Sequence, residues 1–434
     1  MPPFRILING AGVAGPALAC MLLHSTTLDV SLTIVERSPE LRTGGQQVEL
    51  RNQGIPILRK LNLLEKGRTK TVPEEGVIFV DNKGKTIASF DVNDSGNGPQ
   101  SAVSEFEILR GDMVRLLYEE SLELAAKRGK DCLKYEFGKY ATEITQNERA
   151  ATVNFSDGSY GEYDLVVGAD GLGSKTRRLM FPGDIDKAAF HATGLYLCLW
   201  NMPKAEDDEK IKKAIVYQAL KGRGATIRNA APGVTQVLLV INGQTELLRE
   251  VQKLPVKEQK RTWETLYTGA GWEMDRYLKG MWESGDFYMS EAGQIRASKW
   301  SKGRIVLLGD AAYCPSPIKG MGATTSMMGA YHLAGELSKH LRPSASGDGY
   351  DGLQEALAGY DKELRPFVKN TQSLPPGVPG MLYPTTAFGL AVYRWILWGA
   401  WVLKIDKLFQ VLSPSMTKEV KVNDYPALNL PGGQ

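Results

Sequence analysis

Apolar runs separated by polar segments predict alternating strands and helices at the start of the chain. Residues 4–8 form a short apolar run of strand type, residues 16–23 have the composition of a helix, and residues 31–35 form a second strand. Residues 164–168 and 304–308 are further continuous apolar runs, which are typical of parallel strands buried on both faces. The pattern therefore predicts an α/β fold with a parallel sheet covered by helices.

The pattern changes in the middle of the chain. Apolar segments separated by glycine-containing turns predict strands at residues 193–199, 215–220, 225–230 and 235–241, and a hairpin within residues 77–90. We expect an antiparallel sheet that is inserted into the parallel-sheet domain and forms the wall of a pocket. The predicted boundaries are 1–75, 107–184 and 296–373 for the parallel-sheet domain, 76–106 and 185–295 for the inserted domain, and 374–434 for a C-terminal helix and tail.

A glycine-rich turn follows the first predicted strand. Gly10 allows the tight turn, Gly12 lets a pyrophosphate approach the backbone, and Gly15 lets strand and helix pack closely. The following helix offers unpaired N–H groups to the phosphates. Glu36 ends the second strand, where an acidic side chain accepts hydrogen bonds from an adenosine ribose. Strand, turn, helix and acid together predict a dinucleotide site.

A second signature, Gly309-Asp310-Ala311-Ala312, follows the apolar run at residues 304–308. In combination with the first glycine motif it indicates FAD as the dinucleotide. The sequence has no second GxGxxG motif, so a nicotinamide cofactor is expected to visit the protein and not to reside in a domain of its own.

Composition narrows the remaining classes of function. The 52 basic and 49 acidic residues nearly balance, and no basic run is interleaved with aromatic residues, so we expect a small-molecule ligand and no nucleic acid. The four cysteines lack CxxC spacing and the N-terminus leads directly into a strand, which favours a reducing, cytoplasmic setting. The four histidines lack the spacing of metal ligands, so no metal is expected.

Three motifs occur in a familiar order: residues 10–15 with Glu36, residues 164–171, and residues 309–322. With them the chain resembles the single-component FAD-dependent monooxygenases of the para-hydroxybenzoate hydroxylase type. It looks closest to tetracycline-inactivating enzymes and to fungal and microbial tailoring monooxygenases. The resemblance covers residues 4–370.

The resemblance implies contacts with FAD from all three motifs and from loops beside them. Asp310 would accept a hydrogen bond from a ribitol hydroxyl, and Arg110 would reach the phosphates or the ribityl chain. Thr324 stands where the family usually has asparagine. Arg42 matches a basic residue associated with NADPH. The residues implied for FAD are Gly10, Gly12, Ala14, Gly15, Glu36, Arg37, Gly45, Glu49, Arg110, Asp170, Gly309, Asp310, Pro317, Gly320, Gly322 and Ala323.

The implied activity depends on the cofactor more than on protein acids or bases. In the family, NADPH reduces FAD, oxygen adds at the flavin C4a atom, and the hydroperoxide oxidises an electron-rich substrate. We expect an aromatic, polyketide or indole-type substrate, with hydroxylation, epoxidation and Baeyer–Villiger insertion left open. Tyr217 and Arg228, on strands expected to face the pocket, could orient or protonate substrate, although sheet residues more often serve structure. A flavin oxidase and a non-catalytic binding module of the GDP-dissociation-inhibitor kind stay as alternatives.

The segment 385–403 is mostly apolar and approaches the length of a membrane span. Arg394 near its centre would cost roughly 3 kcal/mol in a bilayer. The resembled enzymes use a C-terminal helix to brace their two domains. We therefore expect a bracing helix, with superficial membrane contact as the less favoured alternative, and a monomer by default.

Overall fold

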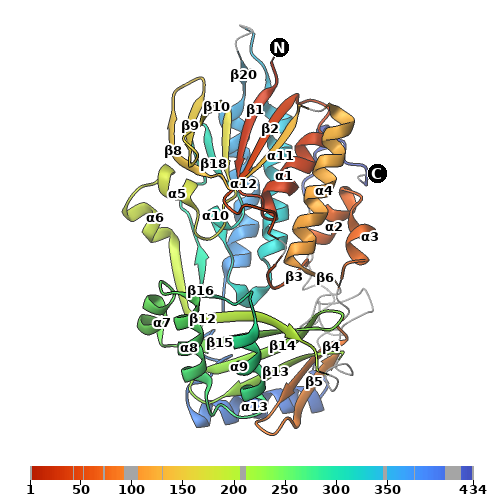
Figure 1. Ribbon diagram of the computed structural model, residues 1–434. Helices are drawn as coiled ribbons and strands as arrows, with labels where there is room; N and C mark the ends of the chain where they lie inside the picture. The colour runs from red at the N-terminus through yellow and green to blue at the C-terminus, as the bar shows by residue number, and fades with distance from the viewer. Residues whose placement is uncertain are drawn as a thin grey trace.

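The computed structural model has two layered domains, drawn one above the other in Figure 1. A parallel sheet with its helices forms the first domain, and a larger twisted sheet with helices on its outer face forms the second. The structure describes residues 2–42, 44–51, 53–71, 74–91, 106–129, 131–205, 212–345, 349–375, 377–405 and 422–432.

The first domain is built on a six-stranded sheet in the order β17-β18-β11-β1-β2-β7. Ile6 of β1 lies opposite Leu165 of β11 and Leu32 of β2, and these pairings are parallel. All three side chains are buried because helices and the small sheet of β8, β9 and β10 pack against the parallel sheet. The strands are β1 (Phe4–Asn9), β2 (Val30–Glu36), β7 (Leu133–Phe137), β11 (Leu165–Gly168), β17 (Ser301–Lys302) and β18 (Ile305–Leu307). The predicted α/β fold class is confirmed.

Helix α11 is the central helix of this domain. It packs between α1 and α12, and glycine and alanine at many of its positions allow the close approach. The helices are α1 (Ala14–His24), α2 (Gly54–Lys60), α3 (Leu64–Arg68), α4 (Arg110–Arg128), α5 (Lys175–Met180), α6 (Asp184–Ala189), α10 (Asp310–Tyr313), α11 (Gly322–His340) and α12 (Leu353–Gln372). The domain also holds the small sheets formed by β3 (Gln47–Glu49) with β6 (Glu107–Leu109), by β8 (Ala141–Gln146), β9 (Ala151–Phe155) and β10 (Tyr160–Tyr163), and by β19 (Arg342–Pro343) with β20 (Tyr350–Asp351).

The second domain is a seven-stranded sheet in the order β16-β12-β15-β14-β13-β4-β5. It is antiparallel as expected, except that β13 and β4 run parallel. Its strands are β4 (Gly76–Val80), β5 (Thr86–Asp91), β12 (Phe190–Pro203), β13 (Ala214–Ala219), β14 (Arg223–Ala231), β15 (Val234–Asn242) and β16 (Tyr288–Ile295). Helices α7 (Thr245–Val251), α8 (Val256–Tyr267) and α9 (Met274–Glu283) pack against one face, around the buried Trp200 and Trp263.

Alternation along β13 decides which side chains face the first domain. Tyr217 points to the core beneath α8 and α9, where its hydroxyl donates to the Ala270 carbonyl and its ring packs 5.4 Å from Trp272. The expectation that Tyr217 faces the pocket is therefore wrong. Its neighbours Val216 and Gln218 lie on the other face of the strand.

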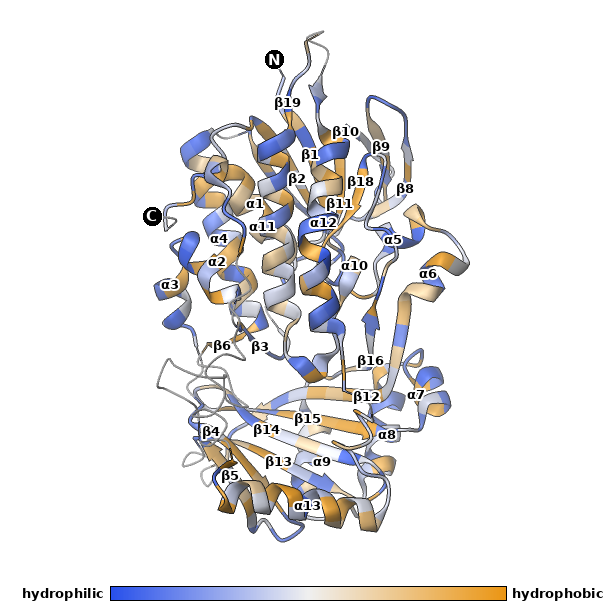
Figure 2. Cartoon of the chain, turned by 180° about the vertical axis from the view of Figure 1, so that it is seen from behind, coloured by the Kyte–Doolittle hydropathy of each residue, from blue (hydrophilic) through white to orange (hydrophobic). Residues whose placement is uncertain are grey.

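Helix α13 (Ala387–Val402) lies at the end of the molecule farthest from the parallel sheet, against β5 (Figures 1 and 2). Arg394 Nη2 donates to the Gln218 carbonyl at 3.1 Å, which holds the helix to the second domain. The expectation that this helix braces the two domains is therefore wrong. Residues 422–432 return to the first domain, where the Tyr425 hydroxyl donates to Glu336 of α11 at 2.8 Å.

Candidate active site

The turn between β1 and α1 has the geometry of a phosphate cradle. Gly10 has a φ of 123°, and a methyl group added there would lie 2.4 Å from the Ala169 carbonyl oxygen. A methyl group at Gly15 would lie 2.1 Å from the Gly10 oxygen, so both positions require glycine. At Gly12 the nearest atom to such a methyl would be Arg110 Nη2, at 3.7 Å. The backbone is thus open at the point where a ligand would approach the start of α1.

Glu36 is fixed beside this turn at the end of β2. Its carboxylate accepts a hydrogen bond from the Ala11 N–H at 3.0 Å and one from the Ser38 N–H at 2.9 Å. Further lone pairs of both oxygens can still accept the hydroxyls of a ribose. Arg37, the next residue, is exposed.

Arg110 begins α4 and joins two loops of the site. Its backbone N–H donates to the Gln46 carbonyl at 3.0 Å. Its side chain passes Gly45, where an added methyl would lie 3.5 Å from the Arg110 Cδ, and reaches Gly12. A guanidinium in this place can pair with phosphate oxygens.

Asp310 begins the short helix α10 on the far side of the turn. Burial raises the pKa of Asp310, and the charge of Arg110 together with a hydrogen bond from Cys314 opposes that rise. Gly309, with a φ of 64°, brings this segment close to Ala14, whose Cβ would lie 3.2 Å from an added methyl. The structure therefore places Asp310, Arg110 and the glycine turn around one space.

Asp170 has a different environment from the other carboxylates. It accepts hydrogen bonds from Ser174 Oγ at 2.5 Å, from the Lys175 N–H at 2.8 Å and from the Thr176 N–H at 2.9 Å. These contacts fix the start of α5 and satisfy most of its acceptor capacity. Its expected contribution to flavin or NADPH binding stays a prediction.

The loop before α11 closes the site on its other side. Pro317 begins a 3₁₀ turn that ends at Gly320, which has a φ of 62°. A methyl group at Gly320 would lie 2.9 Å from Glu49 Oε2, whereas one at Gly322 would meet no atom within 4 Å. Ala323 is buried in the first turn of α11. The start of this helix is open and faces the same space.

Thr324 of α11 binds the backbone of the segment that follows β3. Its Oγ1 accepts the Arg51 N–H at 2.9 Å and donates to the Arg51 carbonyl at 3.3 Å. The position where the family usually has asparagine thus holds the backbone in this chain. Its side chain is fully buried, so it anchors the loop that carries Glu49 and Arg51.

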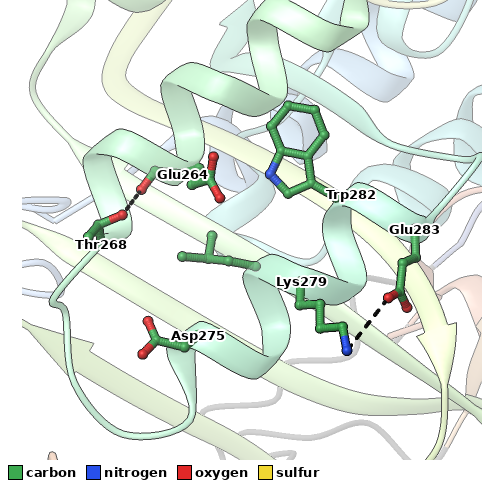
Figure 3. A pocket seen from close by; sticks show the side chains of 7 residues that line it. Glu264, Thr268, Asp275, Lys279, Trp282 and Glu283 are labelled. Carbon is green, nitrogen blue, oxygen red and sulfur yellow. Dashed lines mark hydrogen bonds and ion pairs between the residues drawn. The ribbon is translucent and has the colours of Figure 1, made fainter.

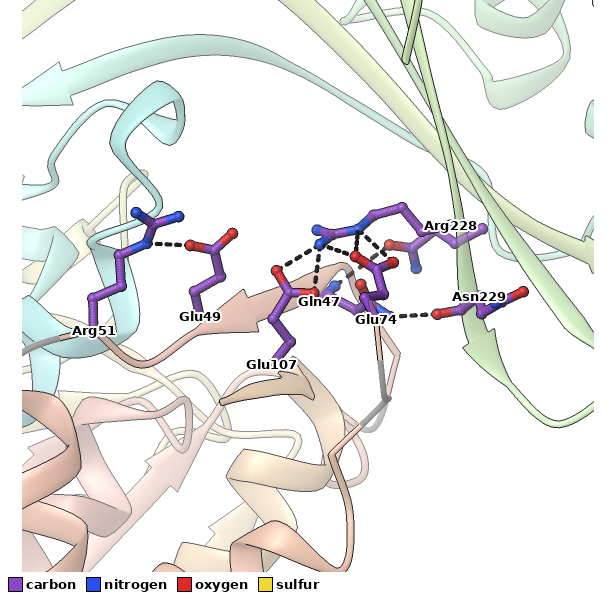
Figure 4. A network of polar contacts seen from close by, with 8 residues as sticks. Gln47, Glu49, Arg51, Glu74, Glu107, Arg228 and Asn229 are labelled. Carbon is purple, nitrogen blue, oxygen red and sulfur yellow. Dashed lines mark hydrogen bonds and ion pairs between the residues drawn. The ribbon is translucent and has the colours of Figure 1, made fainter. Parts of the chain in front are cut away.

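A buried charge cluster lies where β3 and β6 meet β14, as Figure 4 shows. Arg228 Nε donates to Glu74 at 3.0 Å, and its Nη2 donates to Glu74 at 2.6 Å and to Glu107. Glu107 lies opposite Glu49 in the β3–β6 pairing, and Glu49 forms an ion pair with Arg51. The partners of the Arg228 guanidinium are the carboxylates of Glu74 and Glu107, and its expected role toward substrate stays a prediction.

The charges of this cluster do not balance. Three carboxylates, Glu49, Glu74 and Glu107, face two guanidinium groups, Arg51 and Arg228. Burial raises the pKa of Glu107 to about 9; Arg228 opposes the rise, and the charges of Glu74 and Glu49 add to it. Burial and the neighbouring carboxylates thus favour the protonated form of Glu107 within this cluster.

Comparison with known proteins identifies the family. The model of the FAD binding domain family matches residues 4–372. The chain belongs to the FAD-dependent monooxygenases. It is 41% identical over 431 residues to "FAD-dependent monooxygenase asL6" of Sarocladium schorii, covering 98% of each chain. It is 34% identical over 407 residues to "Flavin-dependent monooxygenase eupH" of a Phoma species, covering 91% of each.

Solved structures agree with this membership. The crystal structure of tetracycline destructase Tet(51) matches with a TM-score of 0.73 and 26% identity, covering 98% of this chain and 100% of that chain. A Klebsiella pneumoniae HpxO structure with FAD and uric acid shares the fold, with a TM-score of 0.69 and 18% identity over 94% of this chain and 96% of that one. FAD is the cofactor of the monooxygenase.

The two domains of the monooxygenase are joined by Gln236 of β15. Its Nε2 donates to the Gly45 carbonyl at 3.3 Å and to Asn201 Oδ1 at 3.1 Å, and its Oε1 accepts the Gln47 N–H at 3.4 Å. The sequence interpretation missed Gln236 and Gln47, and it missed the pairing of Arg228 with Glu74 and Glu107. The signal that could have drawn attention to Gln236 is a polar residue within an apolar strand.

Two surface cavities in the described part of the monooxygenase lie away from the glycine turn. One, of about 320 Å³, lies between α8 and α9 (Figure 3) and is lined by Glu264, Thr268, Asp275, Leu278, Lys279, Trp282 and Glu283. The other, of about 520 Å³, lies beside α12 near Trp300. Neither includes the glycine turn, Asp310 or Arg110. Arg42 is exposed on the loop before β3, and its role toward NADPH stays a prediction.

Proposed function

We propose that this monooxygenase uses NADPH and oxygen to hydroxylate or epoxidise an electron-rich aromatic, polyketide or indole-type small molecule, in secondary metabolism or antibiotic modification. The observation that carries the proposal is the position of the cofactor residues against an apolar wall of the second sheet. Leu195, Val240 and Ala292 form this wall on the face opposite α8, and Ile318, in the loop before α11, packs against it. A flat apolar substrate would fit between such a wall and the cofactor loop.

The residues present suit FAD at this interface. We assign the pyrophosphate to the backbone at Gly12 and to Arg110, because the backbone is open there and the cation lies beside it. Glu36 would hold the adenosine ribose, and Asp310 the ribitol chain. The start of α11 at Gly322 would face the pyrimidine edge of the flavin. The remaining contacts that the resemblance implies, from Ala14, Gly15, Arg37, Gly45, Pro317 and Ala323, stay predictions.

The protein itself positions the cofactor and the substrate, excludes water from the reacting region and holds a proton on Glu107. FAD, when bound, supplies the redox chemistry and the activation of oxygen. The apolar wall excludes water from the reacting region. Glu107 holds a proton within the cluster that Glu49 connects to the Gly320 loop. Among the described residues at this interface, no serine–histidine–acid arrangement competes with this interpretation.

A relative's name supports the substrate class. Tetracycline destructase Tet(51), which shares the fold at 26% identity, is named for tetracycline. The likeness extends over 98% of this chain, including the second sheet that would contact a substrate. A substrate of related shape and electron richness is therefore the first choice for a test.

The test is NADPH consumption by the purified protein in air, with its flavin spectrum recorded, across phenols, tetracyclines, other polyketides and indoles. Strong stimulation by one class, with a product heavier by one oxygen atom, would support the proposal. Hydrogen peroxide equal to the NADPH consumed for every compound would establish the flavin-oxidase alternative. Protein that carries FAD but ignores both NADPH and NADH would overturn the proposal. The Asp310→Ala variant should purify with little or no FAD. Its matched control is Asp361→Ala, which alters an ion pair on α12 and should keep the flavin.

A further inference from the structure

Helix α13 exposes an apolar stripe that no described part of the chain covers. Its outward residues include Phe388, Trp395 and Ile396, which are 80%, 69% and 61% exposed, and Leu403 just beyond its end is 69% exposed. Phe388 and Trp395, and likewise Ile396 and Leu403, are seven residues apart, which is about two helical turns and places these side chains along one side of the helix. Figure 2 shows the helix as a largely hydrophobic element at the end of the second domain.

The inward side of α13 is occupied by the protein. Leu390 is buried, and Arg394 reaches inward to the Gln218 carbonyl. The only charged side chain within α13 therefore faces the second domain and not the exposed stripe. This removes the objection that Arg394 would have to enter a bilayer. A helix that is apolar on all sides is normally buried on all sides, and this one is buried on one.

The surroundings of the stripe carry basic charge. Lys404 follows the helix, and the Lys221-Gly222 turn contacts the start of α13 through a Gly222 N–H bond to the Pro384 carbonyl at 3.1 Å. Lys83 and Lys85 lie on the hairpin that leads into β5, the strand on which α13 packs, and the same hairpin carries Asp81, which accepts the backbone N–H groups of both lysines. Along the chain no acidic residue occurs from residue 364 to residue 405.

We propose that the stripe of α13 docks on the surface of an anionic lipid membrane, with the helix lying in the plane of the interface. Tryptophan is enriched at such interfaces, and Trp395, Trp398 and Trp401 are all exposed on this helix. Lysines around an apolar helix face add attraction to anionic headgroups.

The helix rests on the membrane and does not cross it. With 16 residues it is about 24 Å long, which is shorter than the hydrocarbon core. Among the described residues, no helix is long and apolar enough to span a bilayer.

A second copy of the chain fits this surface less well than lipid does. In a two-fold symmetric dimer the same patch meets itself, so the lysines around one stripe would approach those around the other. Like charges facing each other at an interface oppose association, whereas anionic lipid headgroups neutralise them.

The experiment is flotation of the full-length, FAD-loaded protein with vesicles of phosphatidylcholine mixed with phosphatidylserine, and with vesicles of phosphatidylcholine alone. We expect stronger binding to the mixed vesicles and weakening of this binding by salt. The double variant Trp395→Ser, Ile396→Ser should show a partition coefficient into the mixed vesicles that is lower by about tenfold or more. The matched control replaces Leu247→Ser and Leu254→Ser, which are 46% and 47% exposed elsewhere on the second domain, and should change nothing.

Two further measurements distinguish loss of membrane binding from damage to the enzyme and from a change in oligomeric state. NADPH oxidation by the Trp395→Ser, Ile396→Ser variant should equal that of the wild type, because the stripe lies away from the cofactor residues. The molar mass in solution should be the same for both proteins. Absence of vesicle binding, binding that survives the double substitution, or a wild-type dimer that the substitution converts to a monomer would each overturn the proposal.

Discussion

The substitution Glu107→Gln tests whether the cluster at the domain interface stores a proton. The Glu107 side chain is 1% exposed and contacts Arg228, while Glu49 and Glu74 add negative charge around it. Glutamine has nearly the same shape as a protonated glutamate and can still accept a hydrogen bond from Arg228. We therefore expect the variant to match the stability of the wild type at low pH, where Glu107 is protonated in both states, and to exceed it increasingly as the pH rises toward 9.

The sign follows from the direction of the shift. The pKa of Glu107 is raised from its ordinary 4.5 to about 9, so between these values the native state holds a proton that the unfolded state has released. Stability then falls as pH rises, by at most about 1.4 kcal/mol per pH unit, and stops falling above the native pKa. Between pH 7 and pH 9 the wild type should lose up to about 3 kcal/mol that Glu107→Gln does not lose.

The assay is thermal melting of the two proteins at a series of pH values from neutral to alkaline. For 434 residues the expected entropy of unfolding converts this loss into a melting-temperature gap that widens by about 3 °C between pH 7 and pH 9. Glu291→Gln, which alters the pair with Arg249 on the second domain, serves as the control and should follow the wild type at every pH. Parallel curves for Glu107→Gln and the wild type across this range would refute the stored proton.

Other substitutions test the cofactor site and the core of the first domain. Asp310→Ala should purify with little or no FAD, and a flavin absorbance equal to that of the wild type would contradict its assignment. Gly10→Ala should fail to fold because its methyl would meet the Ala169 carbonyl, whereas Gly322→Ala should fold normally and bind FAD about tenfold more weakly, as titration would show. Burial lowers the pKa of His332 from 6.5 to about 4, so between these values the unfolded state binds a proton that the native state does not bind. Stability therefore decreases as the pH is lowered from 6.5 to 4, and thermal melting of His332→Asn should show a smaller decrease over this range.

The elements that the sequence predicted are those set by local rules. The glycine turn follows from the positions at which only glycine fits, as the short distance from Gly10 to Ala169 shows. The parallel strands follow from apolar runs that are buried on both faces. Membership of the FAD-dependent monooxygenases follows from three such motifs in order, which is a property of the chain and needs no knowledge of side-chain packing.

The face of a strand is harder to predict than the strand itself. Tyr217 and Gln218 are neighbours, yet one points to the helices and the other away from them, because successive side chains alternate. No local signal states which of the two faces meets the cofactor domain. The parallel pairing of β13 with β4 adds a strand from a distant part of the chain, and its register depends on contacts made only in the folded state.

The charge cluster depends on contacts between distant segments. Arg228 lies 121 residues from Glu107 and 154 from Glu74, so no motif relates them. The position of helix α13 also depends on contacts between distant segments. Its apolar pattern predicted a bracing helix but could not identify the surface on which the helix packs. In the structure, β5 covers one side of the helix and leaves Trp395 exposed.

Glu49 connects the charge cluster to the cofactor loop, and this connection has a testable consequence. It lies opposite Glu107 across the β3–β6 pair, and its Oε2 lies 2.9 Å from where a methyl on Gly320 would be. An anionic ligand bound along this loop would disfavour a further negative charge nearby, and the coupling must act equally in both directions. We therefore expect FAD to raise the native pKa of Glu107, so that the stability difference between wild type and Glu107→Gln keeps growing to a higher pH before it levels off. A difference that levels off at the same pH in FAD-loaded and FAD-depleted protein would show that the proton and the cofactor are independent.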